Sequence, residues 1–122
     1  MGQQHPTTRK FRKELNSGTA ALVLLALLER SRTPMYRYEI SKLLADSGTS
    51  ISIMKQGALY PVLRSMEGAG LLRSELRASD SGPPRKYYGV TDKGRTALAE
   101  WRDIWTETRD YVDATLKETS NG

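Results

Sequence analysis

The sequence contains no cysteine, one histidine and one phenylalanine among its 122 residues. The absence of cysteine excludes a disulfide framework, a thiol nucleophile and any cysteine-ligated zinc or iron site. The longest uninterrupted apolar run, residues 20–28, is far shorter than the ~20 residues that a membrane-spanning helix needs. The polar, basic start of the chain also lacks the features of a signal peptide. These absences predict a cytoplasmic protein that has no membrane partner.

Residues typical of catalytic sites are also scarce. The only histidine is His5, and the sequence has no Ser-His-Asp set, no glycine-rich phosphate loop and no metal-ligand spacing. The acidic residues near the C-terminus recur at helical spacing, which is typical of a solvated face rather than of a facing carboxylate pair. The sequence therefore predicts a protein that is not an enzyme and that uses no metal or other cofactor.

Charge is present in two zones of opposite sign. Residues 1–95 contain 16 Lys+Arg and 8 Asp+Glu, whereas residues 96–122 contain 3 and 6, within a formal net charge of +5. A basic body attracts the phosphate backbone of a nucleic acid, and an acidic segment is repelled by it. The alternative is a solvated surface on which the asymmetry has no functional meaning.

Local patterns predict three short helices, then a β-hairpin, then one long helix. The first 14 residues are too polar to bury, so they predict either a basic, partly disordered arm or an ordinary frayed terminus. Ser17 or Thr19 is a candidate cap for the first helix, and Thr91 is a candidate cap for the last. The expected helices cover residues 15–30, 36–46, 56–69 and 91–117, the expected strands cover 71–78 and 85–90, and residues 50–54 suit a short strand or an extended connector.

This order of elements is that of a winged helix-turn-helix, in which the third helix enters the DNA major groove and the hairpin lies against the backbone. The predicted fold class is therefore mainly α with a two-stranded β-hairpin. We expect a DNA-binding domain over residues 15–95, preceded by the arm at 1–14 and followed by a dimerisation helix at 96–122. Winged helices also serve as protein-interaction modules, so the fold alone does not decide the function.

Specific motifs resemble the PadR family of bacterial transcriptional regulators over about residues 15–101. They are the run QGALYPVL from Gln56 to Leu63, then Met66-Glu67 and Gly70-Leu71-Leu72, and finally GPPRKYYGVTDKG from Gly82 to Gly94. The resemblance implies a dimeric winged-helix repressor that binds operator DNA and is often released by small aromatic or hydrophobic compounds. The single C-terminal helix resembles the compact subgroup of this family.

The sequence departs from the family pattern at three places. Lys55 stands where a Ser usually begins the recognition helix, and Ala58 stands where a Thr precedes Leu-Tyr-Pro. A capping hydroxyl and one phosphate-contacting hydroxyl are therefore missing, and Lys55 is a candidate replacement that contacts phosphate or guanine. Arg37 replaces the Gly of a common Gly-Tyr-Glu pattern and adds a positive charge.

Independently of the resemblance, the third helix presents Lys55, Gln56, Tyr60 and Arg64 on one side, because 56, 60 and 64 are one turn apart. Lys or Arg can recognise guanine, Gln can recognise adenine, and Tyr usually contacts phosphate. The alternative is a polar solvated face with a partly packed tyrosine. Tyr38 suits either a phosphate contact or core packing. On the wing, Arg85 and Lys86 suit phosphates or the minor groove, although charge at a hairpin also protects against edge pairing.

The last helix carries a stripe that one small domain cannot bury. The stripe recurs at alternating three- and four-residue steps and consists of Leu98, Trp101, Trp105, Thr108, Val112 and Thr115. We expect a second copy of the chain to cover it. Trp101 also matches the position at which the compact family subgroup carries a tryptophan that stacks on planar ligands between subunits, and Trp105 is a candidate second wall. The alternative for Trp101 is interface core.

These observations predict a homodimeric regulator that binds double-stranded operator DNA, acts as a repressor and is released by a planar aromatic or hydrophobic effector. The alternative is a winged-helix dimer that binds a protein or a small molecule and has no operator. The departures at Lys55 and Ala58 leave that alternative open.

Overall fold

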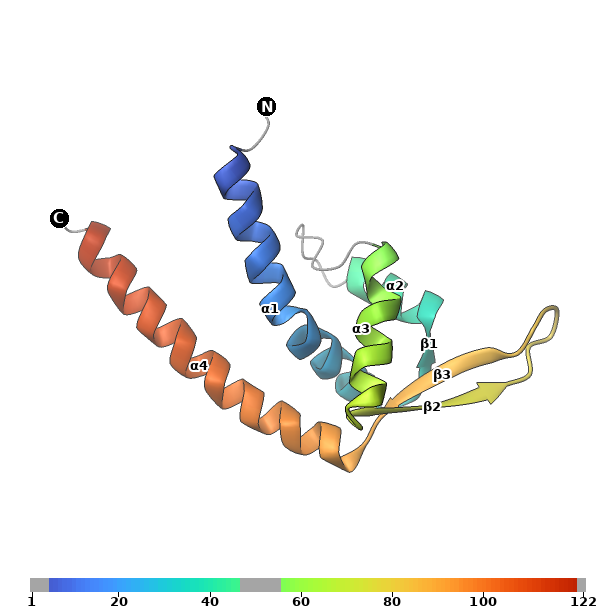
Figure 1. Ribbon diagram of the computed structural model, residues 1–122. Coiled ribbons are helices and arrows are strands. Elements are labelled where there is room, and N and C mark those ends of the chain that lie inside the picture. The colour runs from blue at the N-terminus through green and yellow to red at the C-terminus, as the bar shows by residue number, and fades with distance from the viewer. Residues whose placement is uncertain (1–4, 47–55, 121–122) are drawn as a thin grey trace.

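The apolar run at residues 20–28 lies in helix α1 (Pro6–Ser31) of the computed structural model, which describes residues 5–46 and 56–120 (Figure 1). Leu24, Leu25 and Leu28 of this helix are buried and belong to one cluster with side chains from α2, α3, α4 and both hairpin strands. Burial of leucine side chains is the main contribution to such a core. Helix α1 is therefore the central core element, as the sequence indicates.

Helix α1 begins earlier than the sequence predicts. The side chain of His5 accepts a hydrogen bond from the Thr7 N–H, and Pro6 occupies the first turn, where its missing donor costs little. Thr19 does not cap the helix, because its hydroxyl donates to the Leu15 carbonyl. The expected disorder is wrong for residues 6–14, because the long side chains there favour helix and Lys10 pairs with Glu14 one turn away.

A short strand that the sequence does not predict follows α1. Strand β1 (Met35–Tyr36) leads directly into helix α2 (Arg37–Asp46), and the Tyr36 N–H donates to the Glu39 carboxylate at 3.1 Å. Two residues are too few to show the alternation by which a strand is recognised. The expected two-stranded hairpin is thus part of a three-stranded antiparallel sheet, in the order β1-β3-β2.

The third helix and the wing lie where the sequence predicts them. Helix α3 (Gln56–Gly68) ends in a turn in which Gly70 has φ +81° and the Leu71 N–H donates to the Met66 carbonyl. Strands β2 (Leu72–Arg77) and β3 (Arg85–Val90) then pair along their full length. The far end of this hairpin extends away from the helices as the wing (Figure 1).

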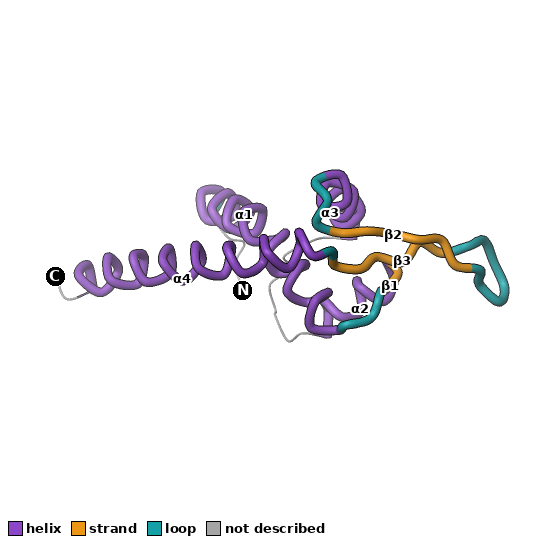
Figure 2. Tube along the Cα trace, turned by 90° about the horizontal axis from the view of Figure 1, so that it is seen from below, coloured by secondary structure: helices purple, strands orange, loops and turns teal. Residues whose placement is uncertain are grey.

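Thr91 caps the long last helix, α4 (Asp92–Ser120). Its hydroxyl donates to the Gly70 carbonyl at 2.6 Å and accepts from the Gly94 N–H at 2.9 Å. Only the start of α4 packs on the core, through Ala97, Leu98 and the partly buried Trp101. The remainder projects on the side opposite the wing (Figure 2).

The fold class is therefore mainly α with a small sheet that carries a wing, as predicted. Lys55 and the connector at 50–54 lie outside the described residues.

Candidate nucleic-acid interface

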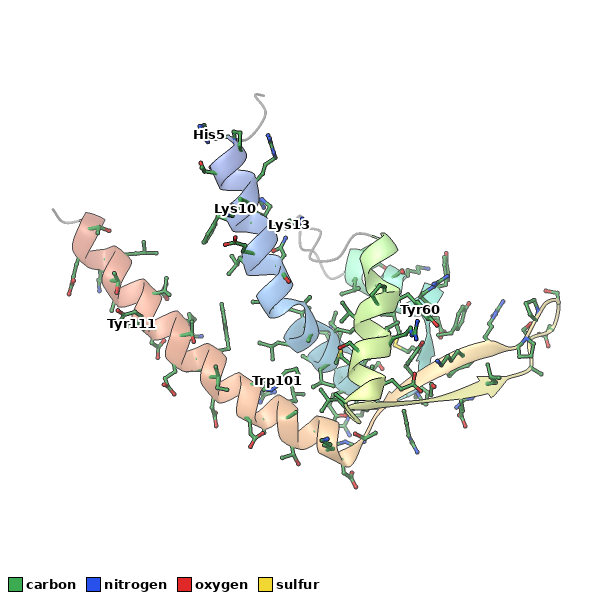
Figure 3. The ribbon with its side chains drawn as sticks, viewed as in Figure 1. His5, Lys10, Lys13, Tyr60, Trp101 and Tyr111 are labelled. Atoms are coloured by element: carbon green, nitrogen blue, oxygen red, sulfur yellow. The ribbon has the colours of Figure 1, made fainter. Side chains whose placement is uncertain are left out.

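A groove lies where α2, α3 and strand β3 meet. It has a volume of about 730 Å³ and combines phenol rings with cationic side chains. The α2 segment, the end of β1 and strand β3 of the wing supply most of the lining, and α3 supplies Tyr60, which is labelled in Figure 3. The lining residues are Tyr36, Arg37, Tyr38, Ser41, Tyr60, Arg85, Lys86 and Tyr88.

Tyr60 is the centre of an arginine cluster. The guanidinium carbon of Arg37 lies 5.5 Å from the ring centroid, and that of Arg64, one helical turn further along α3, lies 5.8 Å from it. A cation over the face of a phenol ring is attracted by the negative face of the ring. Tyr60 therefore holds two arginines from different helices beside the groove while its own side chain stays 38% exposed.

The wing meets the start of α2 through a second contact of the same kind. The guanidinium carbon of Arg85 lies 4.5 Å from the centroid of the Tyr36 ring. The rings of Tyr36 and Tyr38 stack with their centroids 6.3 Å apart. Tyr38 is 66% exposed, so core packing, one of the two roles that the sequence allowed for it, does not occur.

Lys86 differs from its neighbour Arg85 because it already has a carboxylate partner. Its ammonium lies 3.1 Å from Oε1 of Glu67 near the end of α3, and the Ser74 hydroxyl donates to Oε2 of the same carboxylate. The Ser74 hydrogen bond, followed by the contact with Lys86, lowers the pKa of Glu67, and the Glu67 carboxylate raises the pKa of Lys86. This arrangement ties the wing to α3.

Tyr88 closes the inner wall of the groove. Its side chain is 1% exposed, and its hydroxyl has no hydrogen-bond partner among the described residues. Burial raises the pKa of this hydroxyl, so it stays protonated and able to donate. Buried polar groups are nearly always hydrogen-bonded, so an unpaired one calls for an explanation.

The structure brings together most of the residues that the sequence singles out for DNA contact. Tyr38, Tyr60, Arg85 and Lys86 line the groove, and Arg64 flanks it. Gln56 is the first residue of α3, and Lys55 lies outside the described part of the chain.

Sequence reasoning missed the roles of Tyr36 and Tyr88 in the groove, and it noted Arg37 only as an added positive charge. Tyr88 could have been found from strand periodicity, since residues two apart on a strand face the same side and Lys86 was already a candidate. Tyr36 and Arg37 could not, because their place depends on the unpredicted pairing of β1 with β3.

Trp101 and Trp105 lie in a separate groove between α1 and α4, with a volume of about 560 Å³. Its other walls include Leu15, Leu22 and Ile104. Trp105 is 39% exposed, and every residue from 102 to 119 of α4 is exposed. The apolar stripe that the sequence shows is therefore uncovered in the single chain from Trp105 onward.

Other classes of site find no support within residues 5–46 and 56–120. Those residues contain no group of three or more His, Asp or Glu side chains arranged to hold a metal ion. Among the helices described, none combines the length and the apolar character needed to cross a bilayer.

Comparison with known proteins gives matches at the levels of family, sequence and fold. The profile of the transcriptional regulator PadR-like family matches residues 24–100. A curated relative, transcriptional regulator Rv3488 of Mycobacterium tuberculosis, is 40% identical over 67 residues. That match covers 54% of this chain and 62% of the relative, so it spans less than two thirds of the relative's length.

Two solved structures cover more of the chain. A PadR family transcriptional regulator from Eggerthella lenta is 36% identical with a TM-score of 0.77, covering 90% of this chain and 92% of its own. A PadR-like transcriptional regulator from Bacillus cereus is 32% identical with a TM-score of 0.69, covering 84% of this chain and 96% of its own.

Proposed function

Because the chain belongs to the PadR-like family of transcriptional regulators, we propose that it is a cytoplasmic repressor that binds double-stranded operator DNA as a homodimer. The observation that carries this proposal is the groove of arginines and tyrosines between the helix-turn-helix and the wing. Arginine and tyrosine side chains are common donors to DNA phosphates. The family is one of regulators rather than of enzymes.

The arrangement of α3 and the wing suits a duplex. In winged helix-turn-helix proteins the recognition helix enters the major groove, and its N-terminal residues contact base edges. Gln56 stands at that end of α3, where an amide can recognise adenine by two hydrogen bonds. Arg85, which has no ion pair in the described residues, then lies on the wing beside the flanking backbone.

The second copy is argued from the uncovered face of α4. A helix of 29 residues is about 43 Å long at 1.5 Å per residue, and only its first turns pack on the core. Ile104, Val112 and Leu116 are exposed on the remainder, and Phe11 and Leu15 are exposed on α1. Apolar side chains in this number favour burial against a partner, and a two-fold dimer presents two recognition helices to two half-sites.

We further propose that a planar aromatic effector binds beside Trp101 and Trp105. Their groove is mainly apolar, and indole rings favour stacked planar ligands. Such a ligand releases DNA only if it binds better to the DNA-incompetent spacing of the two subunits.

A gel shift with the DNA upstream of the gene itself tests the proposal. Specific binding survives an excess of unrelated competitor DNA, whereas attraction by the basic surface alone does not. A dimer with about three cations per subunit near phosphates releases about six counterions, so log affinity against log salt has a slope near −5. A slope near zero contradicts DNA binding and favours the alternative of an interaction module.

A further inference from the structure

The groove between α2, α3 and β3 contains cations without matching carboxylates. Arg37 and Arg85 form no ion pair with any described residue, and each lies instead against a phenol ring. Both line one concave surface. Guanidinium groups that line the same groove attract an anion, and their N–H groups match the oxygens of a phosphate.

The tyrosines of the groove favour a phosphate over a planar ligand. Arg85 lies over the ring of Tyr36, and two guanidinium groups lie within 6 Å of the Tyr60 centroid. A base or another flat ring that stacks there has to displace an arginine. The phenol hydroxyls and the guanidinium N–H groups are donors, which is what phosphate oxygens need.

Lys86 is a third cation of the groove, but it already has a carboxylate partner. Lys86 pairs with Glu67 at 3.1 Å, and both side chains are partly exposed, at 39% and 32%. Water and competing anions weaken an ion pair at such a position. Glu67 also accepts the Ser74 hydroxyl, so its carboxylate keeps a partner after Lys86 leaves.

Tyr88, whose buried hydroxyl has no hydrogen-bond partner among the described residues, lines the same groove. The Lys86 ammonium stands 5.5 Å from the centroid of the Tyr88 ring, so the two side chains are neighbours in the groove. A buried hydroxyl without a partner destabilises the free protein. Its presence is explained if it acquires a partner in the bound state.

We propose that the groove holds one phosphodiester of the DNA backbone in each subunit, that Lys86 exchanges Glu67 for this phosphate, and that Tyr88 donates its hydroxyl to it. The inference rests on the proposed function, because the DNA supplies the phosphate. Glu67 then acts as an internal competitor for Lys86. It fixes the wing against α3 in the free protein and moderates the affinity for DNA.

The first test compares Glu67→Gln with Glu75→Gln in the full-length chain. Each variant removes one carboxylate that pairs with a cation of the wing, but the Glu75 partner is Arg77, outside the groove. Affinity is measured by fluorescence anisotropy of a labelled duplex at several KCl concentrations. We expect Glu67→Gln to bind about 3- to 10-fold more tightly, with a steeper salt slope by about one per subunit, and Glu75→Gln to change affinity less than about two-fold.

The second test uses Tyr88→Phe, which keeps the buried ring and removes only the hydroxyl. We expect a higher melting temperature without DNA and about 5- to 10-fold weaker DNA binding. Inorganic phosphate replaces chloride at equal ionic strength in a further measurement without DNA. A large phosphate-specific rise in the melting temperature of the unmodified protein would assign the groove to a free anion and overturn its assignment to the DNA backbone.

The outcomes separate this inference from the proposed function. If the unmodified protein shows no salt-dependent binding to duplex DNA, the proposed function fails. If it binds DNA but the two glutamate variants behave alike, or Glu67→Gln binds more weakly, the exchange at Lys86 is wrong. Unchanged DNA affinity in Tyr88→Phe likewise overturns the inference, and this variant decides the matter if Glu67→Gln does not fold.

Discussion

Gly94 lies so close to Leu71 that a Cβ atom on the glycine would stand 2.2 Å from the Leu71 carbonyl oxygen. The same carbonyl accepts the Thr91 N–H, so it cannot move aside without breaking the cap of α4. A side chain of any kind at position 94 therefore forces the start of α4 away from the end of α3.

This contact predicts that Gly94→Ala destabilises the protein by about 1–3 kcal/mol, because the overlap is with backbone atoms. Gly68→Ala is the matched control, since a Cβ at Gly68 meets nothing within 4 Å. Urea unfolding followed by circular dichroism measures both. Equal stability of the two variants would show that the backbone at Gly94 and Leu71 can move apart at little cost.

Mutations are expected to distinguish residues that contact the DNA backbone from residues that recognise bases. Arg85→Ala removes a cation from the wing, so it weakens binding to all sequences similarly and flattens the salt slope by about one per subunit. Gln56→Ala removes a candidate base contact, so it costs about 1–3 kcal/mol at one base position and leaves the slope unchanged. Anisotropy on operator variants measures both effects. Indistinguishable behaviour of the two variants would contradict this division of roles.

Dimerisation is expected to depend on the exposed apolar side of α4. Val112→Asp places a charge on that side and should give a monomer or an aggregate that no longer binds the operator tightly. Thr106→Asp adds the same charge near the acidic residues Asp103 and Asp110 and should leave the dimer intact. Analytical ultracentrifugation distinguishes the two. A dimeric Val112→Asp protein would place the interface elsewhere.

Tryptophan fluorescence tests the effector site between α1 and α4. Planar aromatic dyes should quench the unmodified protein, and Trp101→Ala should lose most of the affinity, because stacking on an indole contributes about 0.5–1.5 kcal/mol beyond burial. Trp105→Ala should lose less, since Trp105 is the more exposed of the two. Quenching that is unchanged in Trp101→Ala would return this residue to a role in the interface core.

Replacing Glu67 is expected to change how the free energy of unfolding depends on pH. Ser74 first and then Lys86 lower the pKa of this carboxylate from its ordinary value of 4.5. A carboxylate with a depressed pKa in the folded state contributes stability that is present above its unfolded pKa and is lost as the pH falls through the folded pKa. The unmodified protein should therefore exceed Glu67→Gln in unfolding free energy at neutral pH, and the difference should vanish in acid. A difference independent of pH would exclude this ionic contribution.

The parts of the fold that repeat a short pattern could be predicted from the sequence. Leu59, Leu63 and Met66 recur at helical spacing before the stop at Gly70, and all three are buried in α3. Thr91 caps α4 as its hydroxyl predicts. These features depend on neighbours within a turn or two, where chain geometry alone fixes which residues meet.

The groove could be predicted only in part, because its walls come from distant segments. Arg85 could be identified as a wing cation, but its contact with Tyr36 requires the pairing of β1 with β3. The partner of Lys86 is Glu67, which lies on another element. In the sequence Lys86 therefore looks like a free cation, although it is paired in the structure. Local periodicity carries no information about such contacts.

Only Thr91 separates the last residue of β3 from the first residue of α4, and its hydroxyl joins α4 to the end of α3 as well. A rotation at Thr91 therefore moves α4 as a rigid helix, which is about 43 Å long at 1.5 Å per residue. A tilt of about 5° at Thr91 displaces the far end of α4 by about 4 Å. In the proposed homodimer, the angle between the two α4 helices sets the distance between the two wings. A small rotation of one helix against the other therefore changes the spacing of the two wings along the duplex.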